Sequence, residues 1–261
     1  MSERAVVKAA NAYTTQWETI AAVWSNLDPL QWQTQSAVPG WRVGDLVAHF
    51  GRVAQTVTDA STQLSARKPL GVSEYLRTYA DSAAEIDEQT RAAGAFDQAS
   101  VTATTAMQGE SAILALASPE LQADPVVVAR RGPVRWSDFI VTRVIELVAH
   151  GDDLARSLGL PTPPTIHRDA LQLTVRELAQ VLSLRAPGRS VEVRVPPFAA
   201  VQCIPGPRHT RGTPGAVIEL EPMTFLRLAD GRVTWDESVA AGLVRASGQR
   251  TEIGACFPLL R

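Results

Sequence analysis

One predicted helix carries polar side chains at positions that could bind a metal ion. The segment RWSDFIVTRVIELVAHGDDLARSLG is apolar around most of its circumference. Its polar residues recur at spacings of four, four and three, so that they share one helical stripe: Thr142, Glu146, His150 and Asp153. Because Glu146 and His150 are one turn apart, a carboxylate oxygen and an imidazole nitrogen could both reach one ion at about 2.0 to 2.2 Å.

A second predicted helix, at residues 43–64, offers a third ligand. Its apolar residues fall on one helical face, and His49 lies on the opposite, polar face. With Glu146 and His150, this histidine would give three nitrogen and oxygen donors from facing helices of a bundle. Three such ligands leave a position for water or substrate, which is the composition of a catalytic zinc site rather than a structural one. We therefore predict one divalent metal, zinc, at these three side chains.

The same polar residues also allow an interpretation without a metal. A glutamate and a histidine four residues apart are common on helices, so they could simply form a solvated polar face. Asp45 could be a first-turn carboxylate that favours the helix dipole, or it could orient an imidazole N–H group. Asp153 could face solvent or act as such an orienting partner. His167, at a helix start, and His209, in a predicted loop, are not expected to be ligands.

Both helices belong to a predicted N-terminal helical domain. Long alanine-rich segments with helical periodicity alternate there with breakers such as Asp28-Pro29 and Pro39-Gly40. Helices are predicted at residues 5–27, 43–64, 73–93, 98–117 and 137–158. Ser137 is the expected N-cap of the last helix. Residues 126–129 are predicted as a strand or an extended connection.

A proline-rich segment marks the boundary with a second domain. Pro161, Pro163 and Pro164 form a stiff, non-helical spacer. We therefore predict a first domain at residues 1–160 and a second at residues 166–261.

The second domain mixes helix and strand patterns. A helix at residues 168–184 is followed by VEVRV, FAAVQCI and AVIELE, whose β-branched content predicts strands. Residues 225–229 and 233–235 flank the turn signal Asp230-Gly231, and a last helix is predicted at residues 236–246. The fold class expected for the chain is therefore α+β with two domains, the second being one sheet covered by helices.

The charge balance argues against nucleic-acid and membrane partners. The chain has 25 basic and 27 acidic residues without a long run of either sign, so a small-molecule partner is expected. Met1 is not followed by the pattern of a secretory signal, and no stretch approaches about 18 uninterrupted apolar residues, so we expect a cytoplasmic protein. Cys203 and Cys256 are far apart and are expected to be reduced thiols.

The motifs around the three candidate ligands resemble a known family. PGWRVGDLVAHF, followed about a hundred residues later by RVIELVAHGDDLA, resembles the N-terminal domain of the mycothiol-dependent maleylpyruvate isomerases of actinobacteria. That domain is similar to the DinB-like four-helix bundles. The matching positions are Trp41, Asp45-Leu46, His49, Glu146, His150 and Asp153-Leu154. In the family, the His, Glu and His positions are the zinc ligands.

The C-terminal segments also carry a resemblance. HTRGTPGAVIELEP and GRVTWDESVAAGLVRASGQRTEIGACFPLL are similar to the actinobacterial sterol-carrier-like proteins, whose second domain has an α/β sterol-carrier-type fold. The resemblance to known proteins therefore covers nearly the whole chain. It implies a DinB-like metal-binding bundle joined to a sterol-carrier-like domain.

The resemblance implies a zinc-dependent isomerase or transferase that uses mycothiol. Coordination to a dication deprotonates a thiol near neutral pH. The thiolate could then add reversibly to the double bond of a maleyl-type substrate and allow rotation to the trans isomer. Other family members attach or remove thiols. We take Asp153, Arg52 and Arg211 as candidate catalytic residues, and Arg143 and Arg208 as further possible partners of substrate carboxylates.

Two other function classes are left open by the residues. A binding module would hold an apolar ligand in the second domain and use the metal structurally or for regulation. A metal-dependent hydrolase would hold hydroxide at the open position, with Asp153 or Asp45 assisting proton transfer. For the isomerase or transferase, the expected partners are a small thiol and a small electrophile, and the chain is expected to be a monomer or a weak homodimer.

Overall fold

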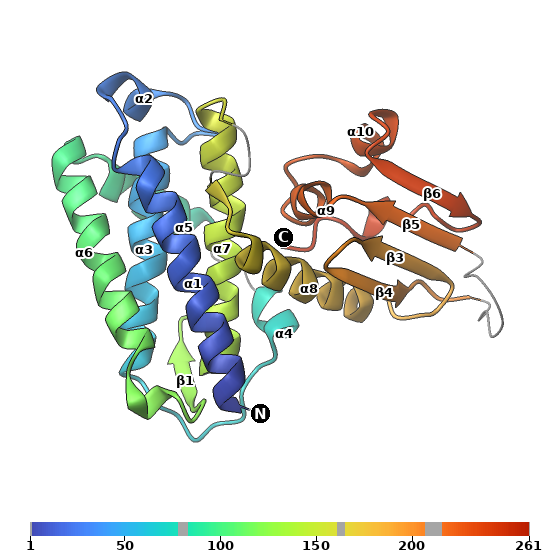
Figure 1. Cartoon of the computed structure of the whole chain (residues 1–261), viewed down its shortest axis with the longest axis horizontal. Coiled ribbons are helices and arrows are strands. Elements are labelled where there is room, and N and C mark those ends of the chain that lie inside the picture. Colours follow the sequence, from blue (N-terminus) through green and yellow to red (C-terminus); the bar gives the residue numbers. More distant parts are fainter. Residues whose placement is uncertain (1, 78–82, 161–164, 207–215, 261) are drawn as a thin grey trace. The chain divides into compact units, whose positions relative to one another are not determined.

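The structure, a computed structural model, describes residues 2–77, 83–160, 165–206 and 216–260. The chain divides into two units, Met1–Leu173 and Thr174–Arg261. The first unit is helical and the second contains a four-stranded sheet, which confirms the predicted α+β fold class (Figure 1). The division falls inside helix α8 (Arg168–Arg185), whereas the predicted proline spacer at 161–164 lies outside the described residues.

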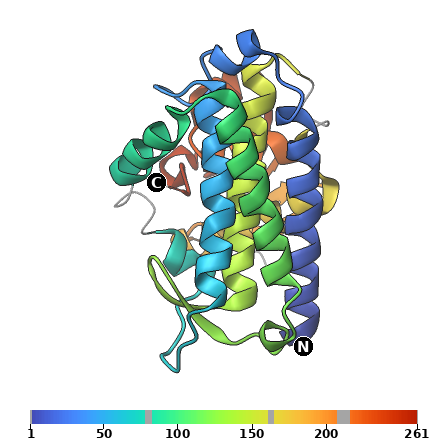
Figure 2. The same cartoon turned by 90° about the vertical axis from the view of Figure 1, so that its left-hand side faces the viewer.

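Four long helices form the bundle of the first unit. They are α1 (Ser2–Trp24), α3 (Val43–Ser61), α6 (Gln98–Leu116) and α7 (Trp136–Ser157), and each lies within a few residues of a predicted helix. Helix α3 packs against α6 and α7, and α1 packs against α7 and α6, as Figure 2 shows. The interior holds apolar side chains that are less than 2% exposed, among them Tyr13, Ile20, Leu46, Phe50, Phe139 and Leu147. Each such side chain stabilises the bundle by roughly 1.5 to 3 kcal/mol through burial.

Shorter elements complete the first unit. These are α2 (Pro29–Gln33), α4 (Val72–Leu76), α5 (Ala83–Gly94), the 3-10 turn Pro119–Leu121 and the antiparallel pair β1 (Val126–Ala129) and β2 (Gly132–Arg135). The prediction of one helix over 73–93 is wrong, because α4 ends at Leu76 and α5 begins at Ala83. Residues 126–129 are a strand because Val127 pairs with Val134 in the buried core.

The second unit is built on a mixed sheet. Its strands are β3 (Val191–Val195), β4 (Ala199–Cys203), β5 (Ala216–Leu220) and β6 (Val244–Gly248), in the order β4-β3-β5-β6. Strands β3 and β5 are parallel, and the other two neighbouring pairs are antiparallel. Alternate residues of β3 and β5 are buried, so one face of each strand points toward a core.

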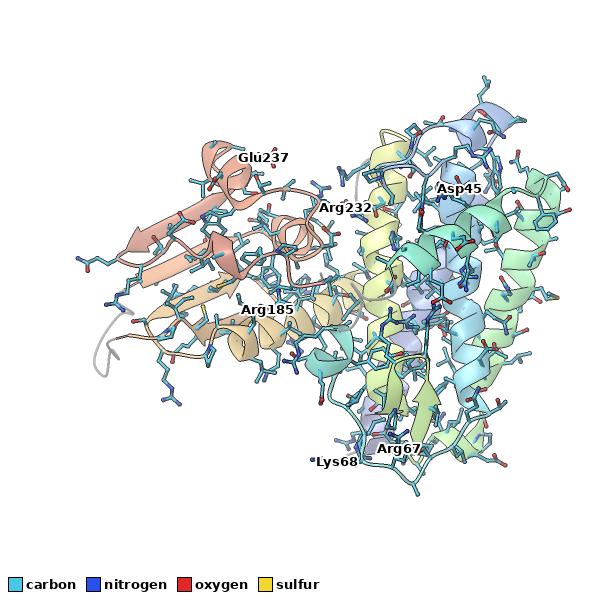
Figure 3. All side chains as sticks on the ribbon, turned by 180° about the vertical axis from the view of Figure 1, so that it is seen from behind. Asp45, Arg67, Lys68, Arg185, Arg232 and Glu237 are labelled. Carbon is cyan, nitrogen blue, oxygen red and sulfur yellow. The ribbon has the colours of Figure 1, made fainter. Side chains whose placement is uncertain are left out.

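Helices α9 (Pro222–Ala229) and α10 (Trp235–Ala240) and the 3-10 turn Gly254–Cys256 complete the second unit. The helix predicted at 236–246 is wrong beyond residue 240, because residues 244–248 pair with β5 as a strand. Arg185, at the end of α8 and labelled in Figure 3, donates to the carbonyl oxygens of Cys256, Pro258 and Leu259, so the last residues are held against this helix. In the described part of the chain, no helix is long and apolar enough to cross a membrane.

Candidate metal centre

A buried carboxylate lies at the start of each of the two helices that carry the polar stripes, α3 and α7. The carboxylate of Asp45, labelled in Figure 3, accepts the Arg42 backbone N–H at 2.7 Å and closes the first turn of α3. The prediction of Ser137 as the N-cap of α7 is wrong, because the helix begins at Trp136 after Arg135. The Ser137 backbone N–H and hydroxyl instead donate to the buried carboxylate of Asp124, at 2.8 and 3.1 Å. This carboxylate satisfies a free N–H group at the start of the helix.

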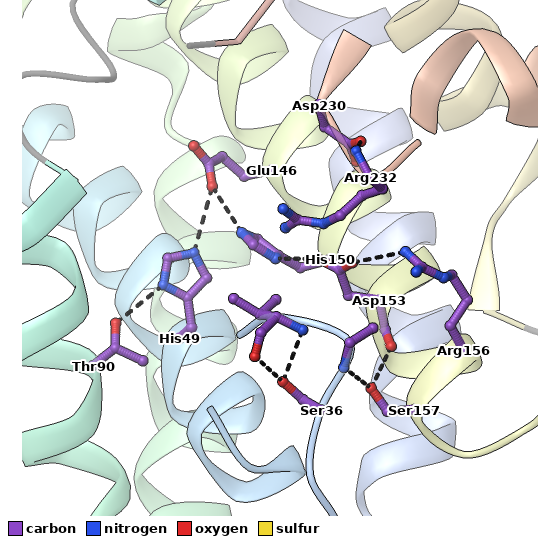
Figure 4. Close-up of polar contacts among 12 residues, drawn as sticks. Ser36, His49, Thr90, Glu146, His150, Asp153, Arg156, Ser157, Asp230 and Arg232 are labelled. Carbon is purple, nitrogen blue, oxygen red and sulfur yellow. Dashed lines mark hydrogen bonds and ion pairs between the residues drawn. The ribbon is translucent and has the colours of Figure 1, made fainter. Parts of the chain in front are cut away.

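The structure brings His49, Glu146 and His150 together. The Nε2 atoms of His49 and His150 lie 3.4 and 3.5 Å from the same oxygen, Oε2 of Glu146 (Figure 4). One ligand atom of each residue lies within 4.8 Å of those of the other two. The imidazole rings meet edge to face, with centroids 4.5 Å apart.

The spacing and chemistry of these donors fit a small divalent cation. Two donors about 2.1 Å from an ion at tetrahedral angles lie roughly 3.4 Å apart, close to the observed 3.4 and 3.5 Å. Two imidazoles and one carboxylate are also a donor set found in zinc enzymes. His49 is 6% exposed, and the side chains of Glu146 and His150 are 16% and 14% exposed, so the cluster is largely shielded from water.

Each imidazole has a polar partner at its other ring nitrogen. Nδ1 of His150 lies 3.0 Å from Oδ2 of Asp153, whose side chain is fully buried and also lies 3.6 Å from Arg156. Nδ1 of His49 lies 3.3 Å from the hydroxyl of Thr90. Partners of this kind fix the orientation and tautomer of a metal-binding histidine, so that its Nε2 lone pair faces the ion.

Burial and mutual contacts set the pKa of all three groups. Burial, together with the charge of His150, lowers the pKa of His49 to about 4, despite the opposing contact with Glu146. Burial also lowers the pKa of His150, but hydrogen bonds to Asp153 and Glu146 outweigh it and raise the pKa to about 9. For Glu146, burial raises the pKa, but hydrogen bonds from both histidines outweigh it and hold the pKa well below its usual range.

At neutral pH, these values make His49 a neutral imidazole, Glu146 a carboxylate and His150 an imidazolium. A cation at Nε2 of His150 would take the place of that proton, because a ligating histidine must be neutral.

Trp41 forms an aromatic wall beside both histidines. Its ring centroid lies 5.1 Å from that of His49 and 6.0 Å from that of His150, and the residue is 5% exposed. The indole N–H donates to Oδ1 of Asp87 on α5 at 2.7 Å, which fixes the ring. Sequence reasoning missed the contacts of Asp87 and Thr90, because two polar residues three positions apart on a predicted helix are usually solvent-facing.

The other predicted site residues lie outside the cluster or outside the described part of the chain. Asp45 closes the start of α3, which supports the first-turn interpretation rather than contact with an imidazole. Arg52, one turn after His49, donates to the side-chain oxygen of Gln89. His167 lies 3.4 Å from the Thr15 hydroxyl and is not a member of the cluster. The predicted candidates Arg208, His209 and Arg211 lie outside the described residues.

Comparisons with known proteins agree with both sequence resemblances. The family model described as mycothiol maleylpyruvate isomerase N-terminal domain matches residues 13–155, and that described as bacterial SCP ortholog matches residues 167–259. No curated protein is detected as a relative. Crystal structures of the mycothiol-dependent maleylpyruvate isomerase and of its single-residue mutant are similar to this chain, at 17% and 16% identity.

For both crystal structures, the TM-score is 0.58, and the alignment covers 95% of this chain and 93% of the other. Likeness at this identity shows a shared fold. The first family model covers more than half of the chain and includes all three clustered residues. The protein therefore belongs to the family defined by the mycothiol maleylpyruvate isomerase N-terminal domain.

Proposed function

We propose that the protein is a zinc-dependent enzyme that uses mycothiol to isomerise a small electrophile of the maleylpyruvate type, or to transfer the thiol to it. The observation that carries the proposal is the convergence of His49, Glu146 and His150 on one point. Among the described residues, the cluster has three members. Structural zinc sites are closed by four protein ligands, so three favour a site open to a further molecule.

The thiol has to come from outside the helical unit, which contains no cysteine. The two cysteines of the chain, Cys203 and Cys256, belong to the second unit. Burial raises the pKa of the Cys203 thiol to about 11 and also raises the pKa of Cys256. Neither thiol is therefore activated as a nucleophile. A low-molecular-weight thiol such as mycothiol fits this requirement.

The residues of the chain have distinct tasks in the proposed reaction. A bound divalent cation would supply the positive charge that lowers the pKa of an incoming thiol toward neutral pH. His49, Glu146 and His150 hold that charge in place, and Asp153 keeps the ring of His150 oriented. Trp41 covers one side of both imidazoles and excludes water there.

The proposed isomerisation needs no oxidant or further reactant. The thiolate forms a carbon–sulfur bond at the double bond of the substrate, and the electron pair moves onto the conjugated carbonyl oxygen. Rotation about the resulting single bond is followed by loss of the thiolate, which restores the double bond in the trans form. Thiol transfer would stop after the first step and protonation of the adduct.

The negative charge of the substrate calls for a guanidinium partner. Arg52 is one turn from His49, and the buried Nε of its side chain has no hydrogen-bond partner among the described residues. We propose the guanidinium of Arg52 as the partner of a substrate carboxylate. Arg211 remains a candidate for the same task from its sequence position alone.

Metal analysis and a turnover assay test the proposal together. Protein purified without a metal resin is expected to hold about one zinc per chain and to isomerise maleylpyruvate only when both zinc and mycothiol are present. Failure to bind zinc after dialysis against it would contradict the proposed metal site. A zinc-bound protein that hydrolyses its substrate without thiol would be a hydrolase, and one that only retains an apolar ligand would be a binding module.

A further inference from the structure

Helix α5 provides no member of the metal cluster, but one of its faces contacts the elements that do. Asp87, Thr90 and Gly94 recur at spacings of three and four, so they share one stripe of the helix. This stripe faces α3, against which α5 packs. Asp87 accepts the indole N–H of Trp41, and Thr90 contacts Nδ1 of His49.

The C-terminal end of α5 also approaches the start of α3. The Gly94 carbonyl oxygen accepts a hydrogen bond from the Arg42 guanidinium at 3.2 Å. A Cβ atom at Gly94 would lie only 2.1 Å from Oδ1 of Asp45, so this approach requires glycine. The stripe therefore fixes the first turns of α3 as well as the His49 ring on its second turn.

The contact between Thr90 and His49 can hold the imidazole in the tautomer that binds an ion. Thr90 is fully buried, and its hydroxyl lies 3.3 Å from Nδ1. A neutral imidazole carries its proton on one nitrogen and a lone pair on the other. For Nε2 to point a lone pair at the shared position near Glu146, the proton must be on Nδ1, and the Thr90 oxygen must accept it.

We propose that Thr90 is a positioning residue for the metal centre: its hydroxyl accepts the Nδ1 proton of His49 and thereby presents Nε2 to the ion. This inference rests on the proposed function. The two histidines are then held differently, His150 by the carboxylate of Asp153 and His49 by a neutral hydroxyl. The neutral partner orients His49 without adding negative charge to a centre that must also accept a thiolate.

Three variants separate this role from general packing. Thr90→Val removes the hydroxyl at nearly constant volume, and Thr90→Ser keeps it. Thr105→Val is the matched control, because Thr105 is also a buried threonine that faces α3, but its hydroxyl donates to the Val47 carbonyl oxygen at 3.2 Å. Zinc affinity is measured by competition with a chelator of known affinity. Thr90→Val is expected to bind zinc about 10 to 100 times more weakly, with Thr90→Ser and Thr105→Val within about threefold of the unmodified protein.

The tautomer of His49 gives a second readout besides zinc affinity. ¹⁵N NMR is expected to show the His49 proton on Nε2 in the metal-free protein, where this atom faces Glu146, and on Nδ1 once zinc is bound. In zinc-loaded Thr90→Val, the Nδ1 proton is expected to lose its protection from exchange with solvent. A proton on Nε2 in the zinc-loaded, unmodified protein, or unchanged zinc affinity in a folded Thr90→Val, would overturn the inference. If the unmodified protein binds no zinc at all, the proposed function fails, whereas zinc binding of equal affinity in Thr90→Val would overturn only the role of Thr90.

Discussion

Replacement of His150 by alanine is expected to abolish stoichiometric zinc binding and to leave the helical bundle folded. The substitution removes one of three donors, and we expect zinc affinity to fall by more than about 100-fold, beyond the range caused by loss of an orienting partner. The apolar interiors of α1, α3, α6 and α7 remain intact. Partial loss of hydrogen-bonding partners at Glu146 and Asp153 costs roughly 1 to 3 kcal/mol, far below the binding energy of zinc in a zinc-dependent fold.

The measurements are zinc content after dialysis and far-ultraviolet circular dichroism of the variant and of the metal-free protein. His167→Ala is the matched control, since His167 belongs to the same unit but lies outside the cluster, and it should keep about one zinc per chain. Full zinc content in His150→Ala would contradict the proposed ligand set. Loss of helical signal on metal removal alone would show that the ion is structural.

Substitution of Gly109 by alanine is expected to destabilise the bundle, although alanine is the better helix former. A Cβ atom at this position of α6 would lie 2.0 Å from Cζ2 of Trp17. The indole cannot move away easily, because two other rings confine it. It stacks on Tyr13 with the ring centroids 6.4 Å apart, and it meets Trp24 edge to face with the centroids 6.3 Å apart. Overpacking of this kind costs about 1 to 3 kcal/mol, which exceeds the gain in helix propensity of about 1 kcal/mol or less.

Urea unfolding should show a lower midpoint for Gly109→Ala with an unchanged slope. Gly71→Ala is the control, because no atom lies within 4 Å of the added methyl group, and its free energy of unfolding should change by less than about 0.5 kcal/mol. A Gly109→Ala variant more stable than the unmodified protein would show that α6 and α1 are not packed as described.

Sequence patterns within each segment predicted the four long helices of the first unit. The apolar periodicity of α1, α3 and α7 is continuous, and α6 lies between the breakers Gly94 and Pro119, so these four helices could be located within a few residues. The same periodicity placed His49 on the polar face of one helix and Glu146 and His150 on that of another. The facing of the two stripes could be expected, because a bundle turns its helices toward a common interior.

Long-range contacts explain what the sequence did not reveal. The sequence pattern extends the last predicted helix to residue 246. Val244 instead pairs with Leu220, and Ala246 pairs with Ile218, so these residues form a strand. Pairing with a neighbouring strand outweighs the local helix propensity of so short a segment. The contact of Thr90 with His49 spans 41 residues. A threonine on a polar helical stripe is usually solvent-facing, so its burial against the centre could not be predicted.

In the proposed function, His49, Glu146 and His150 hold a zinc ion that is open to a thiol. Zinc-edge X-ray absorption of the zinc-loaded protein, recorded before and after addition of mycothiol, tests it most directly. We expect only nitrogen and oxygen neighbours at about 2.0 to 2.2 Å at first, and one added sulfur neighbour at about 2.3 Å with the thiol. A spectrum that mycothiol leaves unchanged, or a sulfur neighbour present before it is added, would contradict the claim.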